Sequence, residues 1–324
     1  MKRPLKPIAV IVLTSILSVF NSAYSQQMTM TLKPEQCCAV KFSTKGATEI
    51  TIDWGDGSQC ETYKHPNLYN DYGSLMCHEY THKYLSIPDF TAYTVTITGN
   101  NITYFACSYN YLTSLDVSKN TALKELYCCG NQLVTLDVSK NTDLIQLICY
   151  DNRLISLDVS NNPKLHRLLC NINSLTTLDL SRSVALRTLD CSGNQLTNLN
   201  VSKNIELSIL ICRNNQLTDI NISNNKLLEI LNCEINLLTG LYTGNNTALR
   251  FIYCRINQLS SEALNDLFET LHENIFADYY DMGWEYETEG KSIRISTNPG
   301  TADCNKKIAE DKGWTIADKG WTVE

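Results

Sequence analysis

The sequence predicts a solenoid of stacked 21-residue turns, with a strand on one side of each turn and a cap at each end. An apolar residue recurs every 21 residues from Ile102 to Leu249 without insertion, which marks eight units. Counted from this residue, position nine is Asn and position eleven is Leu in all eight units. A fixed period of this kind is typical of solenoids, in which each unit buries its apolar side only against its neighbours. Because 21 residues leave no room for a strand and a full helix, the convex side should consist of turns or short 3-10 segments.

Residues 1–25 have the pattern of a secretory signal peptide. Lys2, Arg3 and Lys6 precede an apolar run over residues 8–20, and Ala23-Tyr24-Ser25 supplies the small residues of a cleavage site. The run is too short to cross a bilayer core about 30 Å thick as a helix. No second long apolar stretch follows. We therefore expect an exported protein without a transmembrane segment, located outside the cell, in the periplasm or at the cell surface.

The charge of the chain excludes two classes of partner. The formal net charge is −7, and removal of the predicted signal, which has three basic residues and no acid, leaves a net charge of −10. No cluster of Lys and Arg interrupts this acidic composition. Nucleic acid and anionic membrane surfaces are therefore poor candidates, because both attract basic patches.

Residues 26–100 are predicted to form a small β-sandwich-like cap. A strand pattern over residues 47–53 runs into an Asp-Gly turn, and further strand patterns follow near residue 78 and over residues 93–97. Trp54-Gly55-Asp56-Gly57 and the later His78-Glu79-Tyr80 resemble the polycystic-kidney-disease (PKD) type of β-sandwich. The Phe that is usual in this turn is absent.

Two features of this cap concern possible cross-links and ligands. Cys60 and Cys77 flank a hairpin region and form a candidate disulfide. His78 and His82, together with His65, could hold a metal ion or be structural. No acidic or Cys ligand is clearly placed to complete a metal site, which favours the structural interpretation.

The central region, residues 101–260, contains the eight units. Positions one, four and eleven are apolar and should point inward, and the Asn of position nine should bond backbone groups of the adjacent turn. These residues resemble the L-x-x-L-x-L-x-x-N-x-L pattern of the leucine-rich repeat family, with Cys in place of Leu at position six. The resemblance is closest to short-unit bacterial members such as internalin-like secreted proteins. The predicted Asn ladder is Asn110, Asn131, Asn152, Asn173, Asn194, Asn215, Asn236 and Asn257. The predicted Cys ladder is Cys107, Cys128, Cys149, Cys170, Cys191, Cys212, Cys233 and Cys254.

The ladder cysteines are predicted to be small buried hydrophobic residues. Neighbouring strands bring their Cα atoms to about 4.8 Å, but parallel Cβ vectors suit the torsion of a disulfide poorly. A row of single thiols also cannot surround a metal ion tetrahedrally. Cys129, at position seven, should instead face outward as a free thiol. The pattern does not fix the redox states of Cys37, Cys38 and Cys304.

Residues 261–324 depart from the repeat after Leu259 and are predicted to form a helix–strand–helix cap. Ser261 is suited to cap a helix whose apolar residues follow helical spacing. Residues 291–296 alternate in the manner of a strand. Such a cap would cover the core that the last turn leaves exposed.

Two further features are expected in this C-terminal region. Asp303 is suited to cap a second short helix that ends at Gly313, with Trp314 packed behind it. Residues 278–286 are both aromatic and acidic. They suit packing within the cap and contact with a partner equally well.

The residues that vary inside the repeat mark the candidate binding surface. Positions three, five, seven and eight should face the concave side, where apolar side chains recur. Exposed apolar residues on one sheet face are typical of an interaction site, although such residues also simply suit strands. Tyr127, Ile148 and Leu169 should then form an exposed patch that contributes little to folding. The candidate binding residues are Tyr104, Tyr127, Ile148, Tyr150, Arg167, Leu169, Ile211, Arg213, Phe251 and Tyr253.

The sequence contains no local signature of catalysis. It has no G-x-S-x-G, H-E-x-x-H or phosphate-loop motif. The repeated Asp116, Asp137, Asp158 and Asp179 could bind calcium, but such repetition marks scaffold positions and no oxygen-rich calcium loop accompanies them. We therefore expect no enzyme, no cofactor and no metal site.

The leading interpretation is a non-enzymatic module for protein–protein interaction at or outside the cell envelope, with adhesion as one such role. The internalin-like resemblance implies this function. The alternative is a glycan-associated binding module of the cell surface, because PKD-type domains often accompany glycan-degrading enzymes. Tyr127 and Tyr150 would offer aromatic rings to a sugar. The sequence gives neither the partner's identity nor the oligomeric state, nor whether the protein is retained at the surface.

The predicted signal peptide is directly testable. We expect the exported protein to begin near Gln26, because the apolar run ends at a small-x-small site. N-terminal sequencing of material recovered from the envelope or medium checks this. Recovery of protein that retains Met1 there would contradict the prediction.

Overall fold

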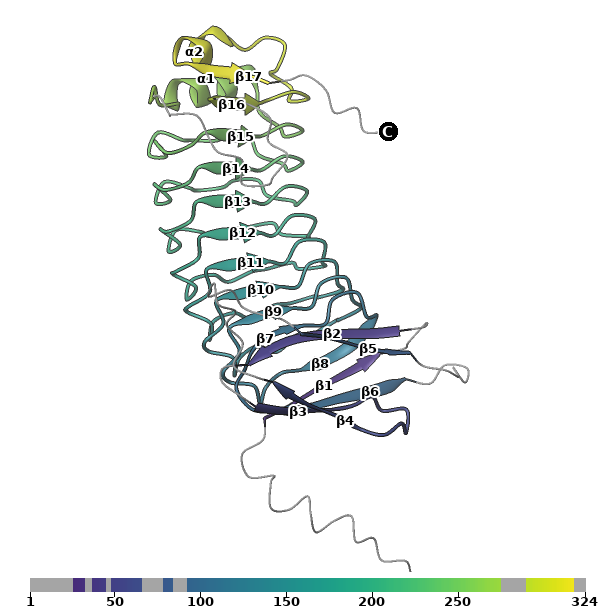
Figure 1. Ribbon diagram of the computed structural model, residues 1–324. Coiled ribbons are helices and arrows are strands. Elements are labelled where there is room, and N and C mark those ends of the chain that lie inside the picture. The colour runs from purple at the N-terminus through teal and green to yellow at the C-terminus, as the bar shows by residue number, and fades with distance from the viewer. Residues whose placement is uncertain are drawn as a thin grey trace, which may run out of the picture.

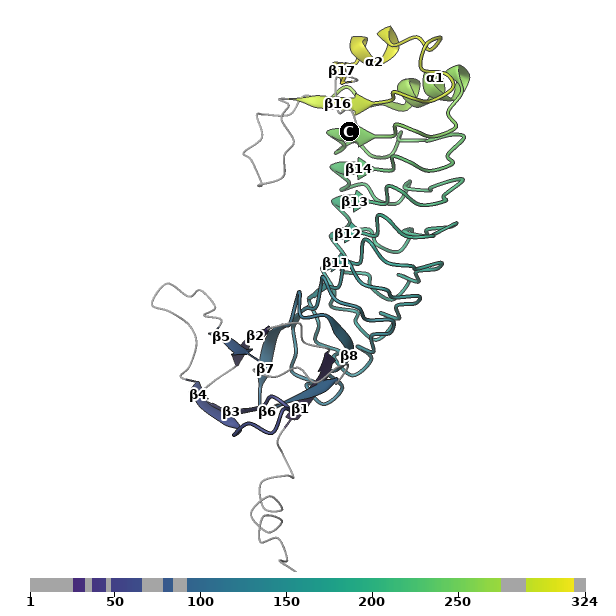
Figure 2. The ribbon, with the colours of Figure 1, turned by 90° about the vertical axis from the view of Figure 1, so that its right-hand side faces the viewer.

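The computed structural model describes residues 26–32, 37–44, 48–65, 78–83, 92–274 and 290–317. The chain forms a column of stacked turns, with a set of longer strands at the N-terminal end and a small cap with two helices at the other (Figure 1). In Figure 2 the short strands lie along one side of the column and the connecting loops along the other. The predicted signal peptide, Cys77 and the segment 278–286 lie outside the described residues.

One strand per turn builds the solenoid sheet. Neighbouring strands are parallel, and each residue pairs with the residue 21 positions further on, as Gln146 does with Arg167. This register confirms the 21-residue unit. Apart from the strands, each turn consists of bends and turns. The strands are β7 (Ile102–Ala106), β9 (Glu125–Tyr127), β10 (Gln146–Ile148), β11 (Arg167–Leu169), β12 (Thr188–Asp190), β13 (Ile209–Ile211), β14 (Ile230–Asn232) and β15 (Phe251–Tyr253).

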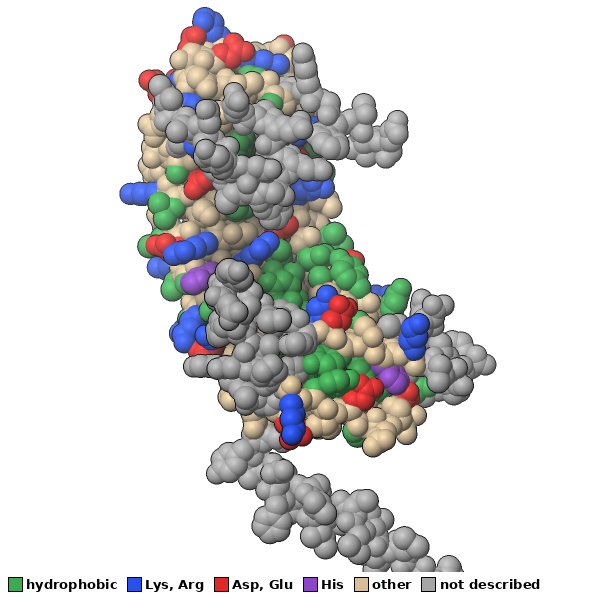
Figure 3. Space-filling model, viewed as in Figure 1, with side chains coloured by type: hydrophobic (Ala, Val, Ile, Leu, Met, Phe, Trp, Pro, Cys, Tyr) green, Lys and Arg blue, Asp and Glu red, His purple; other side chains and the backbone are tan. Residues whose placement is uncertain are grey.

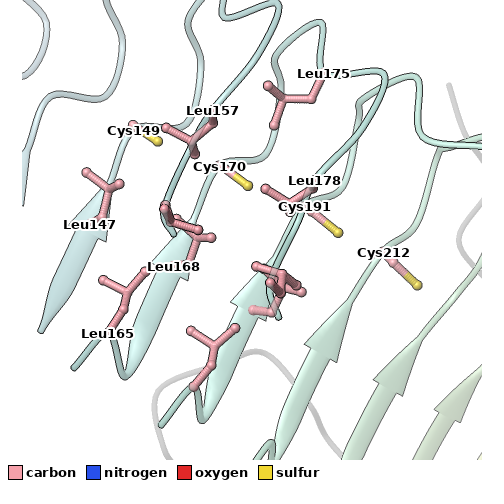
Figure 4. Close-up of a cluster of buried hydrophobic side chains, with 14 of the residues drawn as sticks. Leu147, Cys149, Leu157, Leu165, Leu168, Cys170, Leu175, Leu178, Cys191 and Cys212 are labelled. Atoms are coloured by element: carbon pink, nitrogen blue, oxygen red, sulfur yellow. The ribbon is translucent and has the colours of Figure 1, made fainter. Parts of the chain in front are cut away.

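The inward positions form one continuous core. Residues at positions one, four, six and eleven are fully buried in all eight units, as Leu165, Leu168, Cys170 and Leu175 are in the fourth turn. Figure 4 shows the ladder sulfurs of successive turns in a row beside the stacked leucines. The predictions of inward leucines and buried ladder cysteines are therefore confirmed. Burial raises the pKa of these thiols well above its ordinary value, for example at Cys170.

The Asn ladder satisfies the backbone where each strand bends. The Asn131 Oδ1 atom accepts hydrogen bonds from the backbone N–H groups of Asn110 and Leu112, both at 3.0 Å. Its Nδ2 atom donates to the carbonyls of Cys107 and Cys128, both at 3.0 Å. Each asparagine thus joins its own turn to the preceding one, as predicted.

A second asparagine ladder was not predicted. It occupies position nineteen, on the side of the turn away from the strands. The Asn141 Nδ2 atom donates to the carbonyls of Val117 (3.0 Å) and Asn120 (2.8 Å), in the preceding turn. The repeated Asn was visible in the sequence, but only the fold shows that it is buried. Its members are Asn120, Asn141, Asn162, Asn204, Asn225 and Asn246, with Ser183 in the fourth turn.

The repeated aspartates of position fifteen organise the turns. The Asp116 carboxylate accepts a hydrogen bond from the backbone N–H of Ser118 at 2.8 Å. Asp137, Asp158 and Asp179 make the same contact with the residue two positions later. Hydrogen bonds from Ser118 lower the pKa of the Asp116 carboxyl. These hydrogen bonds support a structural role for the repeated aspartates over a role in calcium binding.

The N-terminal strands form two sheets that continue into the first repeat. One sheet has the order β4-β3-β6-β1-β8, and the other adds β5 and β2 to the end of the solenoid sheet beside β7. Since β1 pairs with β8 and β2 with β7, the predicted boundary near residue 100 is not a structural break. The likeness to a PKD-type domain stays a prediction. The strands are β1 (Gln26–Leu32), β2 (Cys37–Thr44), β3 (Thr48–Asp53), β4 (Glu61–His65), β5 (His78–Lys83), β6 (Tyr93–Gly99) and β8 (Leu112–Asp116).

The repeat does not end after Leu259, which corrects the sequence prediction. Strand β16 (Lys291–Arg294) pairs in parallel with β15, so it begins a ninth turn. Asn298 occupies the ladder site of this turn, and its Oδ1 atom accepts from the N–H groups of Asn257 (3.1 Å) and Leu259 (3.3 Å). The spacing of Ile293, Ile295 and Asn298 matches positions four, six and nine. An insertion between Leu259 and β16 hid this signal.

Two helices and a last strand complete the C-terminal cap. Helix α1 (Ser261–Thr270) begins one residue earlier than expected, because Ser260 is its N-cap and accepts from the N–H of Ala263. Helix α2 (Lys307–Asp311) follows Lys306 without a side-chain cap, so the predicted Asp303 cap is wrong. Gly313 has a φ of +77° after the helix. Trp314 is buried as expected, but it begins a strand, β17 (Trp314–Ile316), that pairs with β16.

A ladder asparagine should be indispensable for stability. We expect Asn215→Ala to lower the free energy of unfolding by roughly 2–4 kcal/mol, because the substitution leaves buried backbone groups unpaired. The Asn215 side chain bonds the Leu196 N–H (3.0 Å) and the Cys191 carbonyl (3.0 Å). Urea denaturation measures the change. Asn198→Ala, at an exposed position, is the control and should stay within about 0.5 kcal/mol of wild type. Equal effects of the two substitutions would contradict the prediction.

Candidate functional site

The candidate site is the face of the solenoid sheet that points away from the core. We call it the outer sheet face and define it by the side chains at positions three, five and seven of each turn. These side chains form two apolar clusters that are separate from the main core. In the view of Figure 3, hydrophobic side chains gather at the height of the first turns, above the N-terminal strands.

The first cluster, here the aromatic cluster, lies on turns two to four. Cys129, Ile148 and Leu169 form its centre, and Tyr127 and Tyr150 pack against them. Three further contacts extend it toward the N-terminus. The rings of Tyr104 and Tyr127 are 5.1 Å apart, the Tyr109 and Tyr150 hydroxyls are 3.0 Å apart, and the Cys129 thiol donates to the Ser108 hydroxyl at 3.1 Å. Hydrogen bonds to Tyr109 and Cys129, together with burial, raise the pKa of the Tyr150 hydroxyl.

The burial of this cluster corrects the sequence predictions. Cys129 is a free thiol on the outer sheet face, as its position predicted, but it is only 5% exposed. Ile148 and Leu169 are 3% and 8% exposed, and Ile211, Phe251 and Tyr253 are also buried on the same face. A side chain buried to this degree contributes about 1.5–3 kcal/mol to stability. The expectation that these residues matter little for folding is therefore wrong. Alternation along a strand predicts the face of a side chain, but not its exposure.

The second cluster, here the C-terminal cluster, lies on turns six to eight. Ile230, Phe251 and Tyr253 are buried together, with Ile209 packed against them. Phe251 and Tyr253 were predicted site residues, whereas Ile209 and Ile230 were not. The sequence could have identified both as site residues, because they are apolar residues at position three, as Phe251 is.

A charged band runs along position seven beside the C-terminal cluster. Arg213 is exposed, and the Arg255 Nε atom lies 4.0 Å from the Glu234 Oε1 atom. Burial raises the pKa of the Glu234 carboxyl, and Arg255, Arg294 and Arg213 oppose this shift. The Arg294 guanidinium lies over the Tyr253 ring at 4.9 Å. Of this band, only Arg213 was among the predicted site residues.

A half-buried carboxylate lies between the two clusters. Asp190, at position five of the fifth turn, accepts hydrogen bonds from the Ser192 N–H (2.9 Å) and hydroxyl (2.6 Å). Burial raises its pKa, against the effect of these hydrogen bonds and of Arg213. Arg167 and Ile211 also lie in this middle region, in turns four and six. The structure thus divides the ten predicted residues between two clusters, the charged band and the region that separates the clusters.

The histidines of the N-terminal cap were a second candidate. The His82 Nε2 atom lies 2.8 Å from the Asp56 Oδ2 atom, and the His82 ring stacks on Trp54 at 5.0 Å. Hydrogen bonds to Ser58 and His82 lower the Asp56 pKa to about 2. The side chains of His65 and His78, like the whole of Cys77, lie outside the described residues. Within the described part of the chain, no three His, Cys, Asp or Glu side chains are grouped as a metal site.

Solved structures show what this architecture is similar to. The functional domain of InlJ from Listeria monocytogenes, which includes a cysteine ladder, is 30% identical over 64% of this chain, with a TM-score of 0.54. The chain has the leucine-rich repeat fold. An internalin (inlF) from Listeria monocytogenes, 21% identical over 63% of this chain with a TM-score of 0.52, shares that fold.

The likeness of this leucine-rich repeat chain to known proteins is limited in extent. The chain spans 42% of the InlJ chain and 56% of the inlF chain. No family model and no curated protein matches it. In the described part of the chain, no helix is long and apolar enough to cross a membrane.

The half-buried Asp190 carboxylate should make stability depend on pH. Because burial raises its pKa above the ordinary value of 3.8, the folded state binds more protons than the unfolded state over the interval between the two values. Stability is therefore lost as the pH rises through the folded-state pKa. We expect Asp190→Asn to increase the free energy of unfolding at pH 7, and we expect this gain to vanish below pH 3.8.

Urea denaturation of both proteins across this pH range measures the effect. Asp179→Asn is the matched control, because Asp179 is exposed and hydrogen bonds to Ser181 lower its pKa. An Asp190→Asn protein that is less stable than wild type at pH 7 would show that Ser192 and Arg213 outweigh the cost of burial.

Proposed function

We propose that this chain is a non-enzymatic module for protein–protein interaction, and that its partner binds the outer sheet face. One observation carries the proposal: the inward positions repeat, whereas the outer ones do not. Position nine is Asn and position eleven is Leu in every unit, but position five runs through Ala, Tyr, Ile, Leu, Asp, Ile, Asn and Tyr. Repetition at the inward positions maintains the scaffold, whereas variation at the outer positions allows a surface that is specific for one partner.

The chemistry of the outer sheet face suits a protein partner. Aromatic and Arg side chains are enriched where proteins bind one another, and both are present here. Tyr104 and Tyr127 are partly exposed and Arg213 is exposed, so side chains of these kinds are available for contact. The apolar clusters beside a charged band offer a partner both apolar contact area and charges to pair with.

The ladder thiols do not suit nucleophilic chemistry. Reactive cysteines are thiolates in electropositive, partly exposed surroundings. Cys149 and Cys191, by contrast, are fully buried, and burial raises the pKa of both well above the ordinary value. This supports a structural role for the ladder.

Export and a role in adhesion are part of the proposal. The signal-like residues 1–25 and the likeness to the functional domain of InlJ support a protein that acts at or outside the cell envelope. The glycan-binding alternative depends on Tyr127 and Tyr150. Both rings pack against the buried aromatic cluster, which leaves less of their surface for a sugar.

Site-specific photo-crosslinking tests the proposal. A benzophenone amino acid replaces Arg213 on the outer sheet face, and in a matched protein it replaces Lys203 at exposed position eighteen on the opposite side. Each protein is illuminated with a surface-protein fraction of the producing cells. We expect protein adducts from position 213 and none from position 203.

Two outcomes would overturn the proposed function. Equal adducts from both positions would show that the outer sheet face is not selective. Absence of adducts from either position, together with binding of the wild-type protein on a glycan array, would favour the alternative.

A further inference from the structure

Position eight of each turn has a left-handed backbone. It directly follows the outer sheet face, where the chain leaves the strand and enters the asparagine bend. Its φ values lie between +52° and +63° in all nine turns. The nine residues are Tyr109, Gly130, Asp151, Ile172, Gly193, Asn214, Ile235, Ile256 and Thr297.

Some of these residues suit this conformation and others do not. Gly, Asn and Asp adopt a positive φ readily, so Gly193 and Asn214 agree with the local geometry. Ile235 and Ile256 do not, because a β-branched side chain at a φ of +54° or +52° is a steric outlier. Isoleucine at these sites destabilises the fold relative to Asn.

The two isoleucines are only partly buried. Ile235 and Ile256 are 37% and 39% exposed, and the neighbouring Leu237 is 45% exposed. The two isoleucines lie on adjacent turns, since the N–H of Asn236 donates to the Ile256 carbonyl at 3.2 Å. Ile235, Leu237 and Ile256 are thus exposed apolar residues on two adjacent turns, and we call them the apolar ridge. Such patches mark interaction sites.

At other turns, the residue at position eight either packs within the protein or has no apolar neighbour at position eight. At the first turn, the Tyr109 ring covers Gly130, where an added Cβ would lie 2.2 Å from the ring. Tyr109 also reaches Tyr150 through its hydroxyl. On turn four, Ile172 stands between Asp151 and Gly193 and has no apolar residue at position eight beside it. Turns seven and eight alone place apolar residues at successive position-eight sites.

The charged band beside the ridge has a surplus of cations. Arg213, Arg255 and Arg294 act on Glu234, and Arg213 also acts on Asp190, so three described guanidinium groups face two described carboxylates. Within the described residues, the buried Nε atoms of Arg255 and Arg294 have no hydrogen-bond acceptor, and Glu234 approaches Arg255 Nε only to 4.0 Å. The whole chain has a net charge of −7, so this positive region is local. Guanidinium groups bind carboxylates in paired geometry, and an acidic segment would complement them.

We propose that turns six to nine dock an acidic segment of a partner protein, whose aliphatic side chains cover the apolar ridge and whose carboxylates pair with Arg213, Arg255 and Arg294. The inference rests on the proposed function and assigns its binding site. The ridge isoleucines then lower the stability of the fold but provide apolar surface for the partner. This explains why Ile is present at positions whose backbone favours Asn.

The first test separates strain from contact. We expect Ile256→Asn to raise the melting temperature by about 2–4 °C, since relief of the left-handed strain is a gain on the order of 1 kcal/mol. Asn214→Ile makes the reverse change at the equivalent exposed position and should lower it by a similar amount. If Ile256→Asn lowers the melting temperature, the isoleucine stabilises the fold and the argument from strain fails.

The second test measures binding with a defined probe. A fluorescent peptide of alternating Glu and Leu should bind the wild-type protein, and a Lys-Leu peptide should not. Ile256→Asn and Arg255→Gln should each weaken binding about tenfold or more, as loss of a central anchor does. Arg153→Gln is the control, because Arg153 is an exposed arginine on turn three, and it should leave the affinity unchanged. Failure of the acidic peptide to bind, or equal loss with Arg153→Gln, would overturn the proposal.

Crosslinking distinguishes this inference from the proposed function. The benzophenone residue is placed at Gln258 on turn eight or at Arg153 on turn three, both at exposed position ten. Adducts from 258 and not from 153 are expected. Adducts only from 153 would overturn the docking site and leave the proposed function intact. Absence of adducts from 153, 213 and 258 would contradict both.

Discussion

The buried bend at the end of each strand is the constraint on which the structure depends. The chain must turn there inside the protein, so its N–H and C=O groups are lost to water and need partners. One asparagine per turn supplies them, as Asn194 does by accepting from the Leu175 N–H at 2.9 Å and donating to the Cys170 carbonyl at 3.1 Å. Since each side chain reaches the preceding turn, a single inserted residue would break contacts in two turns. This explains why the 21-residue period is kept without exception through eight units.

The same constraint separates stability from recognition. The asparagine and leucine columns hold the fold, so positions three, five, seven and eight can change from one turn to the next. The separation is incomplete, because Leu169 and Phe251 on the outer sheet face are also buried. Position eight shows the opposite relation, in which exposed Ile235 and Ile256 are at odds with the local backbone. Our proposal for the binding site rests on residues of this second kind.

The apolar core is covered in a different way at each end of the solenoid. At the N-terminal end, β1 and β2 pair with strands of the first turn and extend its core through residues such as Phe42 and Met30. At the C-terminal end, a ninth turn keeps the ladder geometry through Asn298 but replaces the ladder cysteine by Ile295. Helix α1 lies in the insertion between turns eight and nine. The last ladder cysteine thus meets an aliphatic side chain and not solvent.

The sequence by itself determined the period, the inward columns and the asparagine ladder, because one register satisfies burial and hydrogen bonding in every unit. It also determined the face on which Tyr127 and Leu169 lie, since side chains alternate along a strand. Only the tertiary structure decided how far these side chains are buried. That depends on neighbours distant in sequence, as the contacts of Cys129 with Ile148 and Leu169 show. The ninth turn, the partial burial of Asp190 and the left-handed position eight likewise required the stacked turns, because each is a property of how one turn lies upon the next.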